Sequence, residues 1–131
     1  MACEQTLEAL AVIQDVLGSK NRKVFFHCTV GEDRTGYLAG VYRMLFGGSS
    51  AKNVFQNEMC ARGYEGGNPD KPFNVVNIIR GELTPLFLLM SIQIQNGTLN
   101  LSNLKNASKS ICDIDETDYH PISSEQNWEC N

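Results

Sequence analysis

The stretch Phe26-His27-Cys28-Thr29-Val30-Gly31-Glu32-Asp33-Arg34-Thr35-Gly36 decides how this chain folds. A short segment rich in strand formers, residues 23–27, leads into it. After it, the apolar residues Leu38, Val41, Tyr42 and Leu45 are spaced as one face of a helix. The pattern predicts a buried strand, a tight loop and a helix from about residue 34 to 46. The loop therefore ends at a helix N-terminus, where backbone N–H groups and the helix dipole favour an anion.

The residue types in this loop suit the binding of a phosphate group in front of a thiolate. Cysteine attacks as the thiolate, and a helix N-terminus with a nearby guanidinium lowers the pKa of a thiol. Five residues separate Cys28 from Arg34. The planar guanidinium of arginine can grip two phosphoryl oxygens at once, which lysine cannot do.

The other loop positions supply backbone donors and hydrogen bonds. Gly31 and Gly36 permit unusual φ values and a close approach of the backbone to a ligand. The Thr35 hydroxyl can bond the Cys28 sulfur and stabilise it as a leaving group, and we expect His27 to orient the loop. A loop of this length can direct its N–H groups at three phosphoryl oxygens. The residues that we expect to bind the phosphate are Thr29, Val30, Gly31, Glu32, Asp33 and Arg34.

The whole pattern reads H-C-x-x-G-x-D-R-T-G and is far more specific than its Cys-x5-Arg core. It resembles the signature of the cysteine-dependent protein tyrosine phosphatase superfamily, H-C-x-x-G-x-x-R-[ST]-G, at every fixed position. The resemblance implies that Cys28 is the nucleophile, that Arg34 clamps the phosphate and that no cofactor is needed. Outside the motif the resemblance extends only to the helical pattern. The alternative to a catalytic role is that Cys28 is a buried free cysteine and that the loop only caps the helix.

Asp33 limits the resemblance to a subgroup of the superfamily. Most members of the superfamily carry their general acid on a separate upstream loop, and only 27 residues precede Cys28 here. Myotubularin lipid phosphatases and atypical bacterial tyrosine/phosphoinositide phosphatases instead carry an Asp inside the motif, which implies that Asp33 protonates the leaving oxygen. Two alternatives stay open. In the first, Asp33 and Glu32 are solvated or brace Arg34. In the second, the general acid lies in the stretch Asp118-Tyr119-His120-Pro121, which is similar to the region of the late Asp in low-molecular-weight phosphatases.

Composition sets further expectations for this chain of 131 residues and net charge −4. The negative charge argues against nucleic acid or an anionic membrane surface as a partner. Five cysteines without paired spacing favour the cytoplasm or another reducing compartment over a disulfide framework. No signal peptide, metal site or membrane span is predicted. The glycosylation patterns at Asn96, Asn100 and Asn106 are therefore interpreted as chance matches.

The rest of the chain is predicted to be helical over residues 4–17, about 51–62 and 73–95, with a break near Pro85. Residues 63–72 read as a loop, and residues 96–110 hold at most a short helix. Residues 111–131 are predicted to be a loosely ordered polar tail, whose end Trp128 and Cys130 can pin. Arg62 and Lys71 could reach a phosphate pocket and Tyr64 could flank a substrate, but we expect the two basic side chains to be solvated and Tyr64 to have a packing role.

These elements indicate an α/β fold of the protein-tyrosine-phosphatase type, with the nucleophile loop between a central strand and a helix. Only one convincing strand is visible, and a lone strand cannot satisfy its backbone groups. We therefore expect residues 1–110 to be the C-terminal, mostly helical part of a catalytic domain. A preceding segment or a second chain would complete the sheet.

The sequence thus predicts a phosphatase that hydrolyses phosphomonoesters, with phosphoproteins (phosphotyrosine or dual specificity) as the favoured substrates. The alternative substrates are phosphoinositides or inositol phosphates. Two other classes stay open: an inactive phosphate-binding pseudophosphatase or fragment, and a redox sensor in which Cys28 forms a sulfenate. Neither nucleic acid nor stable membrane insertion is expected.

Overall fold

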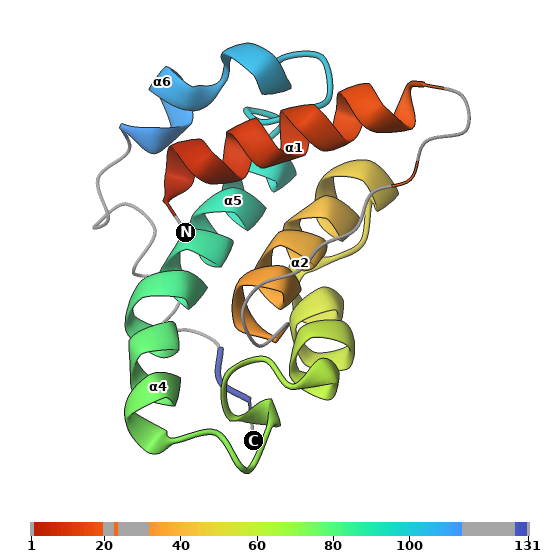
Figure 1. The fold of residues 1–131 in the computed structure, drawn as a ribbon. Helices are drawn as coiled ribbons and strands as arrows, with labels where there is room; N and C mark the ends of the chain where they lie inside the picture. Colours follow the sequence, from red (N-terminus) through yellow and green to blue (C-terminus); the bar gives the residue numbers. More distant parts are fainter. Residues whose placement is uncertain (1, 20–22, 24–31, 114–127, 131) are drawn as a thin grey trace.

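The described part of the chain is built from helices. The structure, a computed structural model, describes residues 2–19, 23, 32–113 and 128–130. In Figure 1, α2 and α5 lie side by side, and α1 crosses them with α6 next to it. The predicted strand lies outside the described residues except for Lys23, so the α/β class stays a prediction. The α-helices are α1 (Cys3–Leu17), α2 (Asp33–Gly47), α3 (Ala51–Asn53), α4 (Phe73–Ile78), α5 (Thr84–Gln95) and α6 (Ser108–Cys112).

Two helical runs contain turns of other widths. The run 51–62 continues from α3 through the π-helical η1 (Val54–Met59) into the 3-10 turn η2 (Cys60–Arg62). The run 73–95 joins α4 to α5 through the π-helical η4 (Ile79–Leu83). The predicted break near Pro85 takes the form of a change in helix width within a continuous run, because the wide segment ends two residues before it. Proline lacks an N–H group and crowds the carbonyl four residues earlier, so a widened turn accommodates it. Two further 3-10 turns are η3 (Glu65–Gly67) and η5 (Leu104–Asn106).

The hydrophobic core lies between α1, α2, η1 and α5. Helix α5 is buried on several sides, in agreement with its nearly all-apolar sequence, and its residues 87–90 are all buried. Val54, Phe55 and Met59 are also buried. Gly40 allows α2 to approach them closely, because a Cβ there would lie 2.6 Å from the Met59 sulfur. The start of α2 is thus held in place by tight packing along the helix.

Some apolar residues lie outside this core. The apolar residues of the first helix form a stripe that is buried at Leu7, Leu10 and Ile13, whereas Leu17 is 45% exposed and Val12 is 59% exposed. Its side chain points about 100° around the helix from Ile13, away from the packed side. Phe73 is 72% exposed at the start of α4.

Two disulfides correct the interpretation of the cysteines. Cys3 bonds to Cys112, which joins α1 to α6, and Cys60 bonds to Cys130, which joins η2 to the C-terminal segment. The partners are 109 and 70 residues apart in sequence, so local spacing gave no sign of them. Only the fold brings their Cα atoms to 5.6 and 5.4 Å. Because these four cysteines pair with one another, no cysteine of the chain is left to bond Cys28.

The described ends of the predicted loose tail are anchored, which corrects that expectation for them. Ile111 is fully buried in α6, and Cys130 is 4% exposed beside its disulfide partner. The Trp128 ring packs edge-on against Phe55, with centroids 5.3 Å apart. Trp128 and Cys130 therefore pin the end of the chain to the run 51–62. Residues 114–127 lie outside the described part, and the domain boundary near residue 110 stays a prediction.

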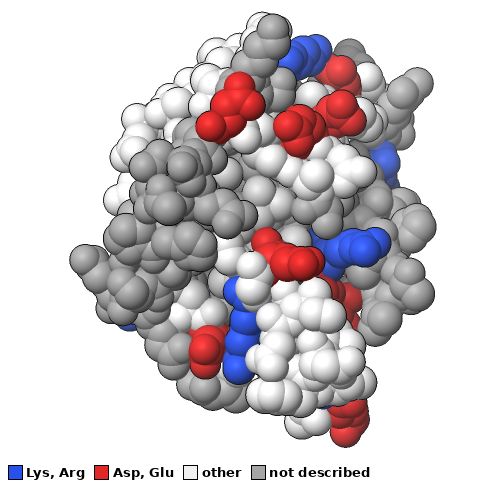
Figure 2. Space-filling view, turned by 90° about the vertical axis from the view of Figure 1, so that its left-hand side faces the viewer, with Lys and Arg blue, Asp and Glu red and all other residues white. Residues whose placement is uncertain are grey.

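The run Phe73–Gln95 is long and apolar enough to cross a membrane by length and composition alone, with a mean hydropathy of 1.5. The sequence analysis expected no such run. Of its apolar window 44% is buried: α5 lies in the core, whereas Phe73 and Ile78 are exposed. On the face shown in Figure 2, acidic and basic side chains of the described residues lie next to each other, without a broad surface of one sign.

Candidate active site

The structure describes the C-terminal part of the predicted loop. Glu32 directly precedes α2, and Asp33, Arg34 and Thr35 form the first turn of this 15-residue helix. The Glu32 side chain does not cap the helix, so it does not occupy the first N–H groups. Such a helix start suits an anion. The remaining predicted site residues lie outside the described part, and their roles stay predictions: His27, Cys28, Thr29, Val30 and Gly31.

The start of α2 is attached to α1 through a buried tyrosine. Tyr37 is fully buried, and its hydroxyl lies 2.9 Å from the Thr6 hydroxyl. Burial raises the pKa of the Tyr37 phenol above its ordinary value, so the group stays neutral in the core. This hydrogen bond fixes the orientation of the helix turn that carries Asp33 and Arg34.

Asp33 is held by the loop that follows η2. Its Oδ1 accepts hydrogen bonds from Lys71 Nζ at 2.6 Å and from the Glu65 backbone N–H at 2.8 Å. Lys71 also donates to the Gly63 carbonyl at 2.7 Å and lies 3.3 Å from Glu32 Oε2. The Lys71 side chain is only 6% exposed. The prediction that Lys71 is solvated is therefore wrong, because the loop folds back over α2 and brings its ammonium between two carboxylates.

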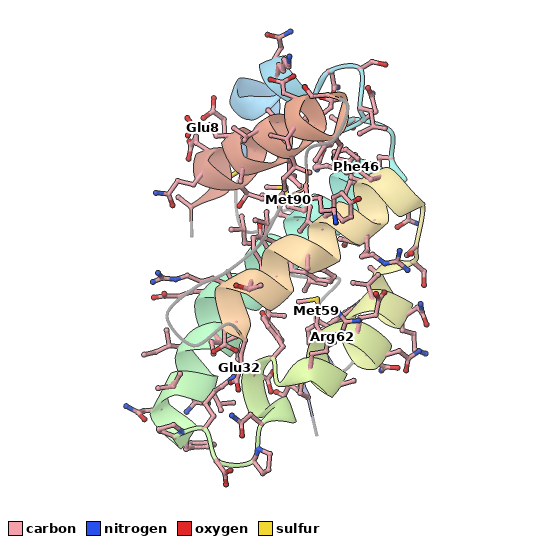
Figure 3. The ribbon with its side chains drawn as sticks, turned by 45° about the vertical axis from the view of Figure 1, so that its right-hand side comes forward. Glu8, Glu32, Phe46, Met59, Arg62 and Met90 are labelled. Carbon is pink, nitrogen blue, oxygen red and sulfur yellow. A yellow bond between two sulfur atoms is a disulfide. The ribbon has the colours of Figure 1, made fainter. Side chains whose placement is uncertain are left out.

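Arg34 is differently placed from its acidic neighbours. It is exposed, and it makes no hydrogen bond or ion pair with any described residue. Glu32 and Asp33 do not brace it: Glu32 accepts from Asn68 Nδ2 at 3.0 Å, and Asp33 from Lys71. Figure 3 shows Glu32 at the N-terminal end of α2. The loop thus engages the carboxylates and leaves the guanidinium available to a ligand.

Arg34 borders a surface hollow of about 260 Å³ between α2 and the run 73–95. Most of its lining residues are aliphatic, and Asp33 and Glu82 are its two acidic ones. The hollow can take an apolar or aromatic group next to a phosphate held at Arg34. Its lining residues are Asp33, Arg34, Val75, Ile78, Ile79, Glu82 and Leu83.

Thr35 has a buried hydroxyl that finds no hydrogen-bond partner among the described residues. Buried hydroxyls are normally bonded, so its partner is to be sought elsewhere. The sequence analysis expected this hydroxyl to bond the sulfur of Cys28.

The sequence of this chain is similar to a known protein family. Residues 2–57 match the tyrosine phosphatase family. This match confirms the resemblance predicted from the loop motif, and it supports phosphatase activity in general. It does not distinguish phosphoprotein from phosphoinositide substrates. Comparisons with curated proteins and with solved structures found no match.

The tyrosine phosphatase match ends before the loop that holds Asp33. A buried acidic residue of this loop, Glu65, holds the loop in place. Glu65 is fully buried at φ 54°, a left-handed conformation that is costly for a residue with a side chain. Its Oε1 accepts hydrogen bonds from Arg80 Nη2 at 3.1 Å and from the Cys130 backbone N–H at 3.1 Å. The hydrogen bond to Glu65 raises the pKa of Arg80 further. Nothing in the Glu-Gly-Gly sequence marked this residue as buried, and the sequence analysis missed it.

Two other residues near this loop have the burial that was expected from the sequence. Tyr64 is fully buried, with its hydroxyl 2.8 Å from the Thr84 hydroxyl, so its predicted packing role is confirmed. Arg62 is exposed, as expected, and borders a separate hollow with Met59 (Figure 3).

The pair between Glu65 and Arg80 predicts a large loss of stability in Arg80→Met. This change leaves the Glu65 carboxylate buried without its cation, which costs about 2–3 kcal/mol of unfolding free energy. The matched control is Arg43→Met, which breaks the exposed pair with Glu58 and costs about 1 kcal/mol at most. Urea unfolding of both variants measures the difference. Equal losses would contradict a supporting role for Glu65.

Proposed function

We propose that this chain is the catalytic part of a cysteine-dependent phosphatase that hydrolyses phosphomonoesters, with phosphotyrosine or dual-specificity protein substrates favoured. The observation that carries the proposal is the complete motif ending in the first turn of α2, with Arg34 exposed there. The match to the tyrosine phosphatase family over residues 2–57, a range that includes the motif, supports it.

In this mechanism, Cys28 attacks phosphorus and the ester oxygen leaves, which forms a phosphocysteine. Arg34 and the loop N–H groups hold the three equatorial oxygens in the transition state. Water then attacks the phosphocysteine, and the thiolate departs with the Thr35 hydroxyl as its hydrogen-bond donor. The buried Thr35 hydroxyl, which lacks a partner among the described residues, supports this last assignment.

The hollow beside Arg34 favours an aromatic leaving group over a polyanionic one. Val75, Ile78 and Leu83 offer an aliphatic wall to a phenyl ring. Glu82 at the same hollow would repel the additional phosphates of an inositol polyphosphate. The test compares kcat/KM for phosphotyrosyl peptides, phosphoseryl peptides, phosphoinositides and inositol phosphates. Preferred turnover of an inositol lipid or an inositol polyphosphate would contradict the assignment.

Asp33 is proposed as the general acid that protonates the leaving oxygen. It lies in the first turn of α2 beside the hollow, and Lys71 and the Glu65 N–H both bond the same oxygen, Oδ1. The carboxyl group is thereby held in one orientation. Catalysis by such an acid matters only for leaving groups that need a proton.

Asp33→Asn is therefore expected to slow hydrolysis of phenyl phosphate by roughly 10²-fold or more. An ester whose leaving group has a pKa near the assay pH should be affected far less, since that group departs as an anion. Steady-state rates on the two esters give the comparison. Equal slowing of both would show that Asp33 only supports the loop, and no slowing of either would place the acid elsewhere. Asn68→Ala serves as a control, because it removes the bonds between the same loop and Glu32 and leaves both bonds to Asp33 in place.

A further inference from the structure

Three asparagines on one surface segment carry the acceptor pattern for N-linked glycosylation. The segment joins α5 to α6 and contains Asn96-Gly97-Thr98, Asn100-Leu101-Ser102 and Asn106-Ala107-Ser108. The side chains of Asn96, Asn100 and Asn106 are all exposed. A glycan can be attached at each of them without disturbing the core.

The packing of this segment decides which of its side chains face solvent. Leu99, Leu104 and Ala107 are 1–2% exposed and pack into the core, which turns the acceptor asparagines outward. Gln14 of α1 donates to the Leu101 carbonyl at 2.9 Å, and Lys105 pairs with Asp15 at 2.8 Å. The acceptors therefore lie on a segment that is attached to α1 and presents them on the surface.

The disulfides are an independent reason to place the chain in a compartment in which asparagine acceptors are glycosylated. The Cys3–Cys112 bond closes α1 onto α6 at the end of this segment, and the Cys60–Cys130 bond closes the C-terminal end. Disulfides form and persist in oxidising compartments such as the lumen of the endoplasmic reticulum and the cell exterior. Glycosylation of Asn-x-Ser/Thr likewise marks surface segments of secreted proteins.

We propose that the chain folds in the oxidising lumen of a secretory pathway and is N-glycosylated at Asn96, Asn100 and Asn106. In the transfer, the side-chain amide nitrogen forms a bond to C1 of a polyprenyl-diphosphate-linked oligosaccharide. The bond from C1 to the diphosphate oxygen breaks, the polyprenyl diphosphate leaves with that electron pair, and the amide nitrogen gives up one proton. This proposal replaces two expectations from the sequence: that the chain resides in a reducing compartment, and that its three glycosylation patterns are chance matches.

Glycans on this segment leave the candidate active site open. In Figure 1, the turn after α5 lies beside α1 and α6, whereas the first turn of α2 lies at the lower end of that helix, away from α1 and α6. Glycosylation and phosphatase activity can therefore be tested separately.

The direct test is peptide mass mapping of the protein from its source organism, before and after an amidase that releases N-glycans and converts the linked Asn to Asp. We expect conversion at all three positions, with the Cys3–Cys112 and Cys60–Cys130 peptides joined before reduction. Unmodified asparagine at all three positions, or free thiols at these four cysteines, would overturn the proposal.

Variants of the full chain, secreted from insect cells behind a cleavable leader, assign the individual sites. Thr98→Ala should remove one glycan although Asn96 is kept, and Thr98→Ser should retain it. Ser102→Ala and Ser102→Thr form the same pair for Asn100. An unchanged mass in both alanine variants would contradict the assignment. Phosphatase rates should not change on glycan release, and a lack of turnover in both forms would count against the proposed activity only.

Discussion

Cys28→Ser abolishes hydrolysis of phosphate esters, with a fall in kcat of about 10⁴-fold or more. A serine hydroxyl is a far weaker nucleophile than a thiolate at neutral pH, and no neighbouring base is proposed to activate it. Binding of the ester should persist, because Arg34 and the backbone N–H groups at the start of α2 are unchanged. Single-turnover kinetics and equilibrium binding measured on the same preparation separate the two effects.

The control for this prediction is the double variant Cys3→Ser/Cys112→Ser. It removes two other sulfur atoms and one disulfide, and it should lower the melting temperature while retaining turnover. Turnover within a few-fold of wild type in Cys28→Ser would refute the nucleophile assignment. Loss of ester binding in that variant would show that the loop no longer holds the phosphate.

Arg34→Lys is expected to reduce kcat/KM by roughly 10³-fold although the charge is kept. An ammonium is a point charge and cannot make the two parallel hydrogen bonds that a guanidinium offers to phosphoryl oxygens. Because Arg34 is exposed and has no hydrogen bond or ion pair with a described residue, the melting temperature should not change. A catalytic loss without a loss of stability is therefore the expected signature.

Arg62→Lys is the matched control for the clamp. Arg62 is also an exposed arginine, and it borders the separate hollow between α2 and the run 51–62. Its replacement should leave kcat/KM unchanged. If Arg34→Lys keeps near wild-type kcat/KM, or if both variants lose it equally, a bidentate grip by Arg34 is excluded.

Local sequence patterns determined the helices of this chain and the position of the candidate site. The spacing of apolar residues predicted α1, α2 and the runs 51–62 and 73–95, since helix formation depends on neighbours three and four residues away. The missing N–H of Pro85 predicted the interruption before α5. The motif around Cys28 predicted the tyrosine phosphatase resemblance, which the match over residues 2–57 confirms.

Tertiary structure alone decided the interactions between distant residues. The pairing of Cys3 with Cys112 depends on α6 packing against α1, and the burial of Lys71 depends on a loop folding back onto α2. The placement of Glu65 beneath Arg80 and Cys130 has the same origin. A sequence pattern reports which residues are neighbours along one element, whereas the burial and pairing of a charge or thiol depend on which elements meet. The outward direction of Asn96, Asn100 and Asn106 was likewise set by the packing of their segment on α1.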